Sequence, residues 1–319
     1  MTQRPEISVV VALSRRDNDL PRLFQAYEKQ TAQRDRFEVI VVNGGARSDV
    51  SRALEEHRRA FPATRVRAID VDTRGAATAK NAGVRDAQSE RLLFVSGDFI
   101  PSRTLVRAHL DFHRNLTEVP AVGIGPAFFS DELRRDPFRR WLEDSGNLFS
   151  VQFRFAEPIW TREYFYVSNT SLARALFQRL GGFDEGRAYE VGDDFEFGLR
   201  LRAAGVRSHF LAKAVAWHVR PVTLYERIEA LRRNGEAARR PRIRRALGVH
   251  WQSVIDRSLP DLTALARRAG EREDAASNPD TRAARYQAEL DLAFAEGYHG
   301  VCSAQEEPHA PGPGAPAHS

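Results

Sequence analysis

The stretch Ile7-Ser8-Val9-Val10-Val11-Ala12-Leu13 decides the fold class of this chain. It is short, apolar and rich in β-branched residues, which is typical of a strand that is buried on both faces. Residues 19–30 follow with apolar side chains at helical spacing, namely Leu20, Leu23, Phe24 and Tyr27. A second apolar run, residues 37–42, stops at Asn43-Gly44-Gly45. The order strand, helix, strand predicts a parallel sheet.

The same alternation continues toward residue 100. The patterns predict helices over residues 48–61 and 75–87 and strands over residues 64–71 and 91–95. We therefore expect an α/β fold, Rossmann-like, with a mostly parallel sheet and helices on both faces. Ligands of such sheets bind beyond the carboxyl ends of the strands. That rule selects three candidate segments: Leu13-Ser14-Arg15, Asn43-Gly44-Gly45 and Ser96-Gly97-Asp98.

The second half of the chain is expected to change from mixed to helical structure. Carboxylates open a predicted helix over residues 193–204, and Gly205 is suited to end it. Amphipathic helices are predicted over residues 222–248 and 279–297. We divide the chain into an α/β domain (1–220, with halves 1–115 and 116–220), a helical extension (221–302) and a tail (303–319). The tail, rich in Pro, Gly, Ala, His and Ser, is expected to be disordered.

The composition indicates a globular protein without an intramolecular disulfide or a membrane span. The chain has 319 residues, 42% of them hydrophobic and 29% charged, which is ordinary for a globular protein. Its single cysteine, Cys302, excludes an intramolecular disulfide, and no apolar run approaches the roughly 20 residues of a membrane span. No leader-like segment precedes the first strand. We therefore expect a soluble, cytoplasmic protein.

The formal net charge is +5, and arginines gather late in the chain. Residues 227–245 hold eight arginines against Glu229 and Glu236. We interpret this run mainly as the solvated face of a helix, with the arginines directed away from the core. No aromatic residue interrupts it, so nucleic acid is not an expected partner. A peripheral contact with the anionic inner face of a membrane stays open.

Several segments, in this order, resemble family 2 glycosyltransferases with the GT-A fold. The first block comprises residues 7–13, 38–45, 75–83 and 93–98. The second block comprises Asn169-Thr170-Ser171-Leu172, Leu180-Gly181-Gly182-Phe183-Asp184-Glu185 and residues 192–202. This second block is also similar to the C-terminal part of galactosyltransferase-like members. The resemblance ends near Pro221.

The resemblance implies a donor site for a nucleotide diphosphate sugar of the UDP or dTDP type. The residues that would bind this donor are Leu13, Asn43, Gly44, Lys80, Ser96, Gly97 and Asp98. Two of them depart from the family pattern. Gly44 stands where the family commonly has an aspartate that reads the base, and Lys80 stands where it usually has arginine. Asn43 still offers both a donor and an acceptor to a base edge.

The resemblance also implies a divalent metal, Mn²⁺ or Mg²⁺, that binds the diphosphate. The family's DxD-type motif reads Ser96-Gly97-Asp98 in this chain, so only the last carboxylate is kept. His218 stands where many members place a histidine beside the metal. The implied ligands are therefore Asp98 and His218, a mixed set that favours Mn²⁺ over Mg²⁺.

Catalysis in the family rests on two acidic residues at a helix start. The second of them is the general base of an inverting displacement, which corresponds to Asp194. Asp193 is expected to hold an acceptor hydroxyl, and Asn169 and Glu196 are further acceptor-site candidates. Glu196 has an alternative role, because Arg200 lies four residues ahead and can form an ion pair with it.

Two other functions compete with sugar transfer to an acceptor hydroxyl on a small molecule, a glycan or a lipid-linked compound. The first is a degenerate member that binds a nucleotide or sugar without turnover, which Ser96 and Gly44 motivate. The second is a sugar-nucleotide pyrophosphorylase. That class needs a glycine-rich phosphate loop after the first strand, and Leu13-Ser14-Arg15-Arg16 contains no glycine.

Overall fold

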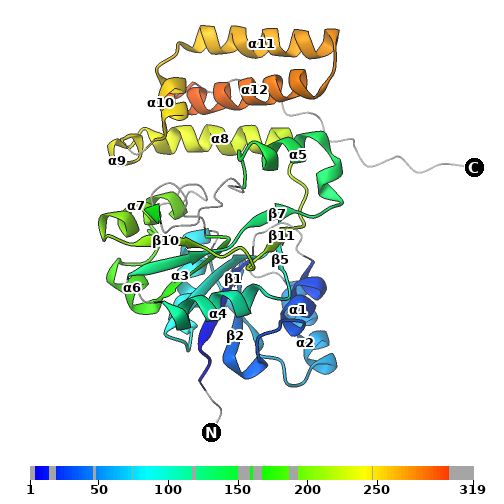
Figure 1. The fold of residues 1–319 in the computed structure, drawn as a ribbon, viewed down its shortest axis with the longest axis vertical. Coiled ribbons are helices and arrows are strands. Elements are labelled where there is room, and N and C mark those ends of the chain that lie inside the picture. Colours follow the sequence, from blue (N-terminus) through cyan, green and yellow to red (C-terminus); the bar gives the residue numbers. More distant parts are fainter. Residues whose placement is uncertain are drawn as a thin grey trace, which may run out of the picture.

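The computed structural model describes residues 4–13, 19–45, 48–73, 75–116, 120–149, 159–160, 167–186, 193–245 and 247–301. Within these residues, eight strands form one sheet in the order β3-β2-β1-β4-β9-β6-β10-β8, and three form a smaller sheet in the order β5-β11-β7 (Figure 1). The strands of the large sheet are β1 (Ile7–Ala12), β2 (Phe37–Gly44), β3 (Val66–Val71), β4 (Arg91–Ser96), β6 (Ala121–Ile124), β8 (Ile159–Trp160), β9 (Asn169–Ala173) and β10 (Arg207–Phe210). Those of the small sheet are β5 (Phe99–Pro101), β7 (Ala127–Phe129) and β11 (Ala216–His218).

The first half of the large sheet is parallel, as predicted. β1 pairs in parallel with β2 and β4, and β2 pairs in parallel with β3. β9 then enters between β4 and β6 and runs antiparallel to both. The amino end of β9 therefore lies at the same edge of the sheet as the carboxyl end of β4.

Helices cover both faces of the large sheet because the strand side chains alternate. Val9 and Val11 belong to a core with α1 (Leu20–Glu28), α2 (Ser48–Ala60) and α4 (Leu105–Asn115). Val10 belongs to the opposite core, with α3 (Ala76–Asp86), α6 (Arg174–Arg179) and α7 (Asp193–Ala203). Gly83 lets α3 lie close to β1, since a Cβ there would come 2.4 Å from a Val10 methyl carbon.

The C-terminal part is a stack of helices above the sheets (Figure 1). It contains α8 (Leu224–Ala238), α9 (Pro241–Arg244), α10 (Val249–Ile255), α11 (Leu259–Ala275) and α12 (Pro279–His299). The prediction of one helix over residues 222–248 is wrong. Arg240 is extended, with ψ 128°, because the ring of Pro241 excludes the helical conformation from the residue before it. The sequence patterns also missed α10 and α11.

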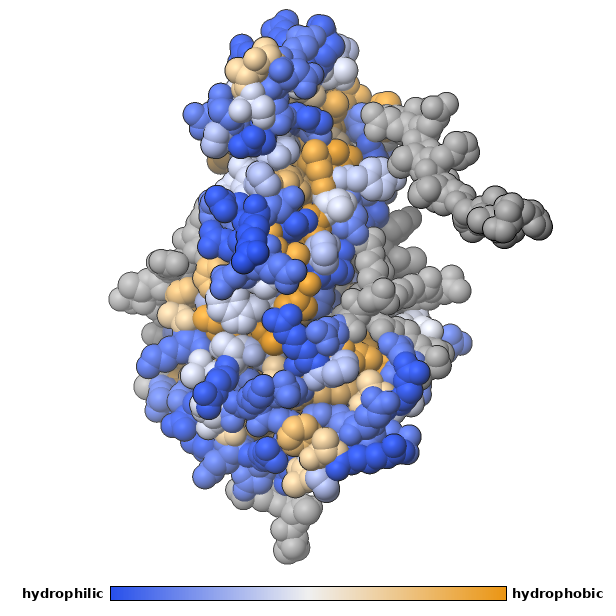
Figure 2. Space-filling model, turned by 90° about the vertical axis from the view of Figure 1, so that its right-hand side faces the viewer, coloured by the Kyte–Doolittle hydropathy of each residue, from blue (hydrophilic) through white to orange (hydrophobic). Residues whose placement is uncertain are grey.

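The helical part shares its core with the α/β part. Leu231 of α8 and Phe294 of α12 are buried in the same apolar cluster as Val9. Figure 2 shows a mainly hydrophilic surface on this side of the molecule, with apolar patches between the upper helices and the lower α/β part. Three short elements complete the fold: the 3-10 helices at Arg34–Arg36 and Leu133–Arg135, and α5 (Pro137–Asp144).

Not every arginine of the late cluster belongs to a solvated face. The Arg232 side chain is 17% exposed and lies 2.8 Å from Glu296 of α12. Arg239 donates a hydrogen bond to the carbonyl of Tyr298 at 2.8 Å. The expectation that the arginines of residues 227–245 form mainly a solvated face is therefore wrong for Arg232, because α12 packs over it. None of the helices among the described residues combines the length and apolar character needed to cross a bilayer.

Candidate active site

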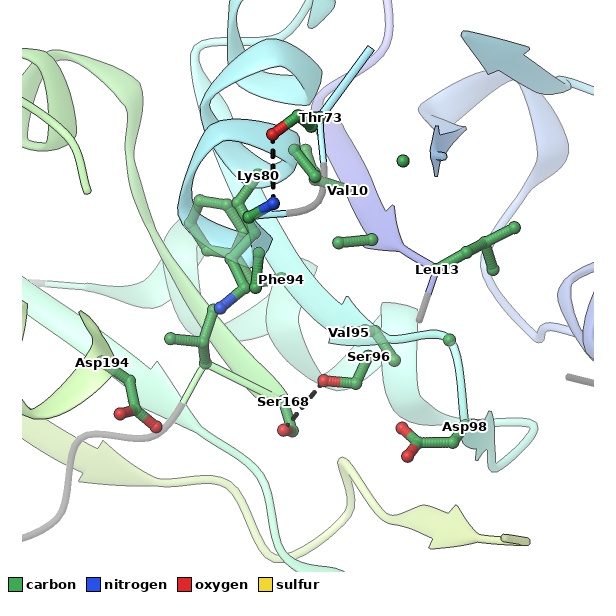
Figure 3. Close-up of a pocket in the computed structure, with 17 residues that line it drawn as sticks. Val10, Leu13, Thr73, Lys80, Phe94, Val95, Ser96, Asp98, Ser168 and Asp194 are labelled. Carbon is green, nitrogen blue, oxygen red and sulfur yellow. Dashed lines mark hydrogen bonds between the residues drawn. The ribbon is translucent and has the colours of Figure 1, made fainter. Parts of the chain in front are cut away.

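A cavity of about 290 Å³ lies at the carboxyl ends of β1, β2 and β4 (Figure 3). It forms because three parallel strands end at one edge of the sheet and the N-terminal part of α3 closes one side. Six of the seven predicted donor residues line it: Leu13, Gly44, Lys80, Ser96, Gly97 and Asp98. Asp194 of α7 lines the same cavity from the other half of the domain.

Ser168 joins the two halves of the cavity. Its hydroxyl lies 3.0 Å from that of Ser96, and in Figure 3 it lies between Asp194 and Asp98. The sequence patterns missed Ser168 because nothing in them shows that β9 runs antiparallel beside β4. They also missed Thr73, which lines the cavity just beyond β3. The carboxyl-end rule, applied to the third strand as well, would have drawn attention to that segment.

Asp98 lies where the chain passes from β4 of the large sheet to β5 of the small one. Its Oδ2 is 3.2 Å from His218 Nε2 and 3.5 Å from Arg220 Nε. Burial by itself would raise the pKa of Asp98. The hydrogen bond from His218 and the charges of His218 and Arg220 outweigh burial, so the pKa of this carboxyl lies below its usual value. Asp98 is therefore ionised at neutral pH.

The Asp98–His218 pair fits two ligands of one metal ion. Bonds of about 2.1 Å at right angles put neighbouring ligand atoms about 3 Å apart, close to the observed 3.2 Å. No group of three or more His, Cys, Asp or Glu side chains suited to a metal occurs among the described residues. Among the described residues, an ion at this site would have these two side chains as its ligands.

Three aromatic rings hold the His218 imidazole in place. The ring centroids of Phe99, Phe129 and Phe149 lie 4.9, 5.3 and 5.4 Å from its own. The side chain is only 5% exposed, and Nδ1 is buried without a hydrogen-bond partner among the described residues. The orientation of His218 therefore depends on packing within the small sheet and its neighbours.

Asn43 lies beneath the cavity and does not line it. The side chain is 1% exposed, and its Nδ2 donates to Asp70 Oδ1 at 2.6 Å. Asp70 is the partner of Asn43 in the β2–β3 register, so it lies at the same edge of the sheet. It is an exposed carboxylate near the position where Gly44 replaces the family's aspartate, and the sequence patterns did not select it.

Lys80 lies on α3, with its Nζ 5.2 Å from the ring centre of Phe183. The ring of Phe183 belongs to the predicted Gly-Gly-Phe-Asp-Glu turn. A second residue of α3, Asn81, forms hydrogen bonds with this turn. Asn81 donates to the carbonyl of Phe183 at 2.8 Å and accepts from its backbone N–H at 3.0 Å. The turn between α6 and α7 is thereby attached to the wall of the cavity.

The first turn of α7 carries the predicted catalytic carboxylates. Asp194 Oδ1 accepts a hydrogen bond from the backbone N–H of Phe195 at 2.8 Å. The side chain of Asp193 lies outside the described part of the chain. Glu196 is buried and forms an ion pair with Arg200 at 2.7 Å, which is the alternative role that its spacing suggests. Glu196 therefore supports α7, and its carboxylate is engaged within the helix.

Asn169 does not reach an acceptor. It is fully buried at the start of β9, where Nδ2 donates to the carbonyls of Ala214 and Pro126 at 2.6 and 3.2 Å. Its Oδ1 faces His109 Nε2 at 3.0 Å. The prediction that Asn169 binds the acceptor is wrong, because both ends of its amide bind other parts of the protein.

Comparisons with known proteins agree with this architecture. The family model described as "Glycosyltransferase like family 2" matches residues 5–237. A validoxylamine A glucosyltransferase of Streptomyces hygroscopicus subsp. limoneus is 28% identical over 227 residues, covering 63% of this chain and 49% of that protein. The chain spans about half the length of the validoxylamine A glucosyltransferases it matches.

Two solved structures share the fold over nearly the whole chain. One is a mannosyltransferase from Pyrobaculum calidifontis in complex with GDP-Man and Mn²⁺, with a TM-score of 0.57 and 18% identity, covering 92% of this chain and 87% of that one. The other is the 1–349 segment of S. aureus TarS in complex with UDP, with a TM-score of 0.51 and 15% identity, covering 94% of this chain and 93% of that segment. The family match and the shared fold place this chain in glycosyltransferase family 2, with a GT-A fold.

Proposed function

We propose that this protein transfers a sugar from a nucleotide diphosphate sugar to an acceptor hydroxyl, with inversion at the anomeric carbon. The observation that carries the proposal is the single cavity that Ser96, Gly97, Asp98 and Asp194 all line. Groups suited to the donor and a carboxylate suited to proton abstraction are thus within one site. The matched glucosyltransferase and the neighbour in complex with GDP-Man support the same reaction class.

Asp194 is the proposed general base. Its carboxylate takes the proton of the acceptor hydroxyl while that oxygen bonds to the anomeric carbon. The bond from this carbon to the diphosphate oxygen breaks, and its electron pair leaves with the nucleoside diphosphate. Attack from the face opposite the leaving group produces inversion. The positive end of the α7 dipole favours the ionised carboxylate, which the base must be before it accepts a proton.

The leaving diphosphate needs positive charge near it. Lys80 lines the cavity, and Arg220 lies beside Asp98 at its edge. Asp98 and His218 are the residues that would hold a Mn²⁺ or Mg²⁺ ion together with the diphosphate, and such an ion would neutralise the charge that develops on it. Ser96 offers a hydroxyl to the ribose where the family has a carboxylate.

The proposed classes of donor and acceptor follow from the family resemblance. A UDP- or dTDP-type donor is proposed because the family resemblance implies one. Gly44 lacks the family's aspartate, and the exposed carboxylate of Asp70 lies at the same edge of the sheet. The acceptor is a hydroxyl of a small molecule, a glycan or a lipid-linked compound. We retain one alternative, a non-catalytic nucleotide-binding member, because Ser96 replaces the first carboxylate of the DxD-type motif.

A ligand screen followed by a turnover assay tests this function. We expect one of UDP, dTDP or GDP to raise the melting temperature of the protein, and to raise it further with Mn²⁺. A ligand present at 100 times its Kd stabilises the folded protein by about 2.7 kcal/mol. The corresponding sugar nucleotide should then be hydrolysed or transferred, and EDTA should slow the reaction. Binding without any turnover would support the non-catalytic alternative, and no binding of any nucleotide would overturn both.

A further inference from the structure

Asn169 lies where the chain crosses between the two sheets. β6 of the large sheet continues into β7 of the small sheet through Gly125 and Pro126, and Ala214 precedes β11. The Asn169 amide donates to the carbonyls of Pro126 and Ala214, so it bridges both crossing segments. The Pro126 carbonyl also accepts from the backbone N–H of Ala216, the first residue of β11.

Atoms at this junction are packed without spare room. The backbone N–H of Gly125 donates to the Asn169 carbonyl at 3.0 Å. A Cβ on Gly125 would come 2.2 Å from the Ala214 carbonyl oxygen and 2.5 Å from Asn169 Nδ2. Small changes in the Asn169 side chain must therefore displace one of the two crossing segments. The segment after Ala214 leads within four residues to His218.

The donors and acceptors of the buried hydrogen bonds around Asn169 can be assigned in one consistent way. Two carbonyls face its nitrogen, so its oxygen faces His109 and accepts from Nε2–H. A neutral imidazole carries one proton, so His109 Nδ1 accepts from the Ser171 hydroxyl at 2.8 Å. The Ser171 oxygen then accepts from His113 Nε2 at 2.9 Å. Burial favours the neutral form, since it lowers the pKa of His109 to about 4.

We infer that Asn169 is a positioning residue for the active site: its amide locks the small sheet, and with it His218, against the large sheet that carries Ser96. Two observations support this role. Asn169 has no contact with the cavity, yet its neighbour Ser168 lines it and lies 3.0 Å from Ser96. His218 in turn faces Asp98, which lies at a third crossing between the sheets, from β4 to β5. For its effect on turnover, the inference rests on the proposed function.

Asn169→Asp tests the role, because it keeps the side-chain shape and replaces the amide donor by a carboxyl oxygen. The matched control is Leu54→Ala in α2, which opens a cavity where α2 packs against α1 and β3, elements that contribute nothing to the Asn169 network. Two quantities are measured: the 1H–15N signals of the His218 imidazole, assigned with His218→Gln, and kcat at saturating donor. The three aromatic rings around His218 make its signals sensitive to small displacements.

We expect Asn169→Asp to shift the His218 signals and to lower kcat by about 10- to 100-fold. Leu54→Ala should lower the melting temperature while leaving both quantities of the folded protein unchanged. If Asn169→Asp does not fold, His109→Phe removes the donor to Asn169 Oδ1 and should shift the same signals. Unchanged His218 signals in a folded variant would overturn the inference. Should the wild type transfer no sugar, the proposed function fails, and the His218 signals still decide the positioning role.

Discussion

Asp194 is the residue on which the proposed chemistry depends. Asp194→Asn keeps the size of the side chain but cannot accept a proton at neutral pH. We expect kcat to fall by about 10²-fold or more, while the Kd of the nucleoside diphosphate stays within a factor of about three of the wild type. Steady-state kinetics and calorimetric titration measure the two quantities.

Glu196→Gln is the matched control for that substitution. Glu196 lies two residues further along α7, and its carboxylate is engaged by Arg200. Removing the charge should lower the melting temperature and leave kcat nearly intact. If instead Asp194→Asn retains activity and Glu196→Gln loses it, the general base is Glu196.

At the scale of elements, the crossing of α8 and α12 depends on two glycines. A Cβ on Gly297 would come 1.9 Å from the Arg232 carbonyl oxygen, and one on Gly235 would come 2.0 Å from that of Phe294. Backbone atoms cannot move aside as a flexible side chain can. We expect Gly297→Ala to lower the free energy of unfolding by about 1–3 kcal/mol or more, as overpacked sites do. Urea unfolding measures the change.

Gly270→Ala in α11 provides the comparison, because a Cβ there meets no atom within 4 Å. Alanine restricts the unfolded chain without straining the folded one, so the free energy of unfolding of this variant should rise by about 0.4–1 kcal/mol. Equal effects of the two substitutions would show that the α8–α12 contact is not as close as described.

At the scale of the whole molecule, two buried histidines should make the protein sensitive to acid. Burial lowers the pKa of His109 to about 4, and burial together with the charges of His109 and Arg91 lowers the pKa of His113 to about 3. Between the unfolded pKa near 6.5 and these values, the unfolded chain binds a proton that the folded chain does not. Stability is therefore full above pH 6.5 and lost as the pH falls.

Within that window, each histidine should lower the free energy of unfolding by about 1.4 kcal/mol for every unit by which the pH falls. We expect the free energy of unfolding to be about 2–3 kcal/mol lower at pH 5 than at pH 6. His250 acts in the opposite direction, because the hydrogen bond that it donates to Asp291 raises its pKa, but its side chain is 52% exposed and its effect is smaller. His113→Asn should roughly halve the slope of the free energy of unfolding against pH. Substitution of an exposed histidine, His299→Gln, should leave that slope unchanged. A flat profile would contradict the neutral, buried state.

Much of the fold follows from local sequence. The apolar runs place β1, β2 and β4, and Asp19 caps α1 through the backbone N–H of Arg22. Pro241 carried the signal for the break between α8 and α9, although the periodicity on both sides led to a single predicted helix. These features depend on neighbours within a few residues, so the sequence contains them directly. The tail after Cys302, predicted to be disordered, lies outside the described residues.

The chemical character of the site can be predicted from local sequence: the carboxyl ends of three parallel strands, Ser96-Gly97-Asp98 among them, and Asp194 at a helix start. Which polar side chains face the cavity and which hold it together depends on contacts between distant parts of the chain. Asn43 and Asn169 look equally suited to a ligand in the sequence, yet Asp70 and the carbonyls of Pro126 and Ala214 engage them. The physical reason is that an amide must satisfy its hydrogen bonds wherever it is buried. Its partners, between 27 and 60 residues away, are brought close only by the tertiary fold.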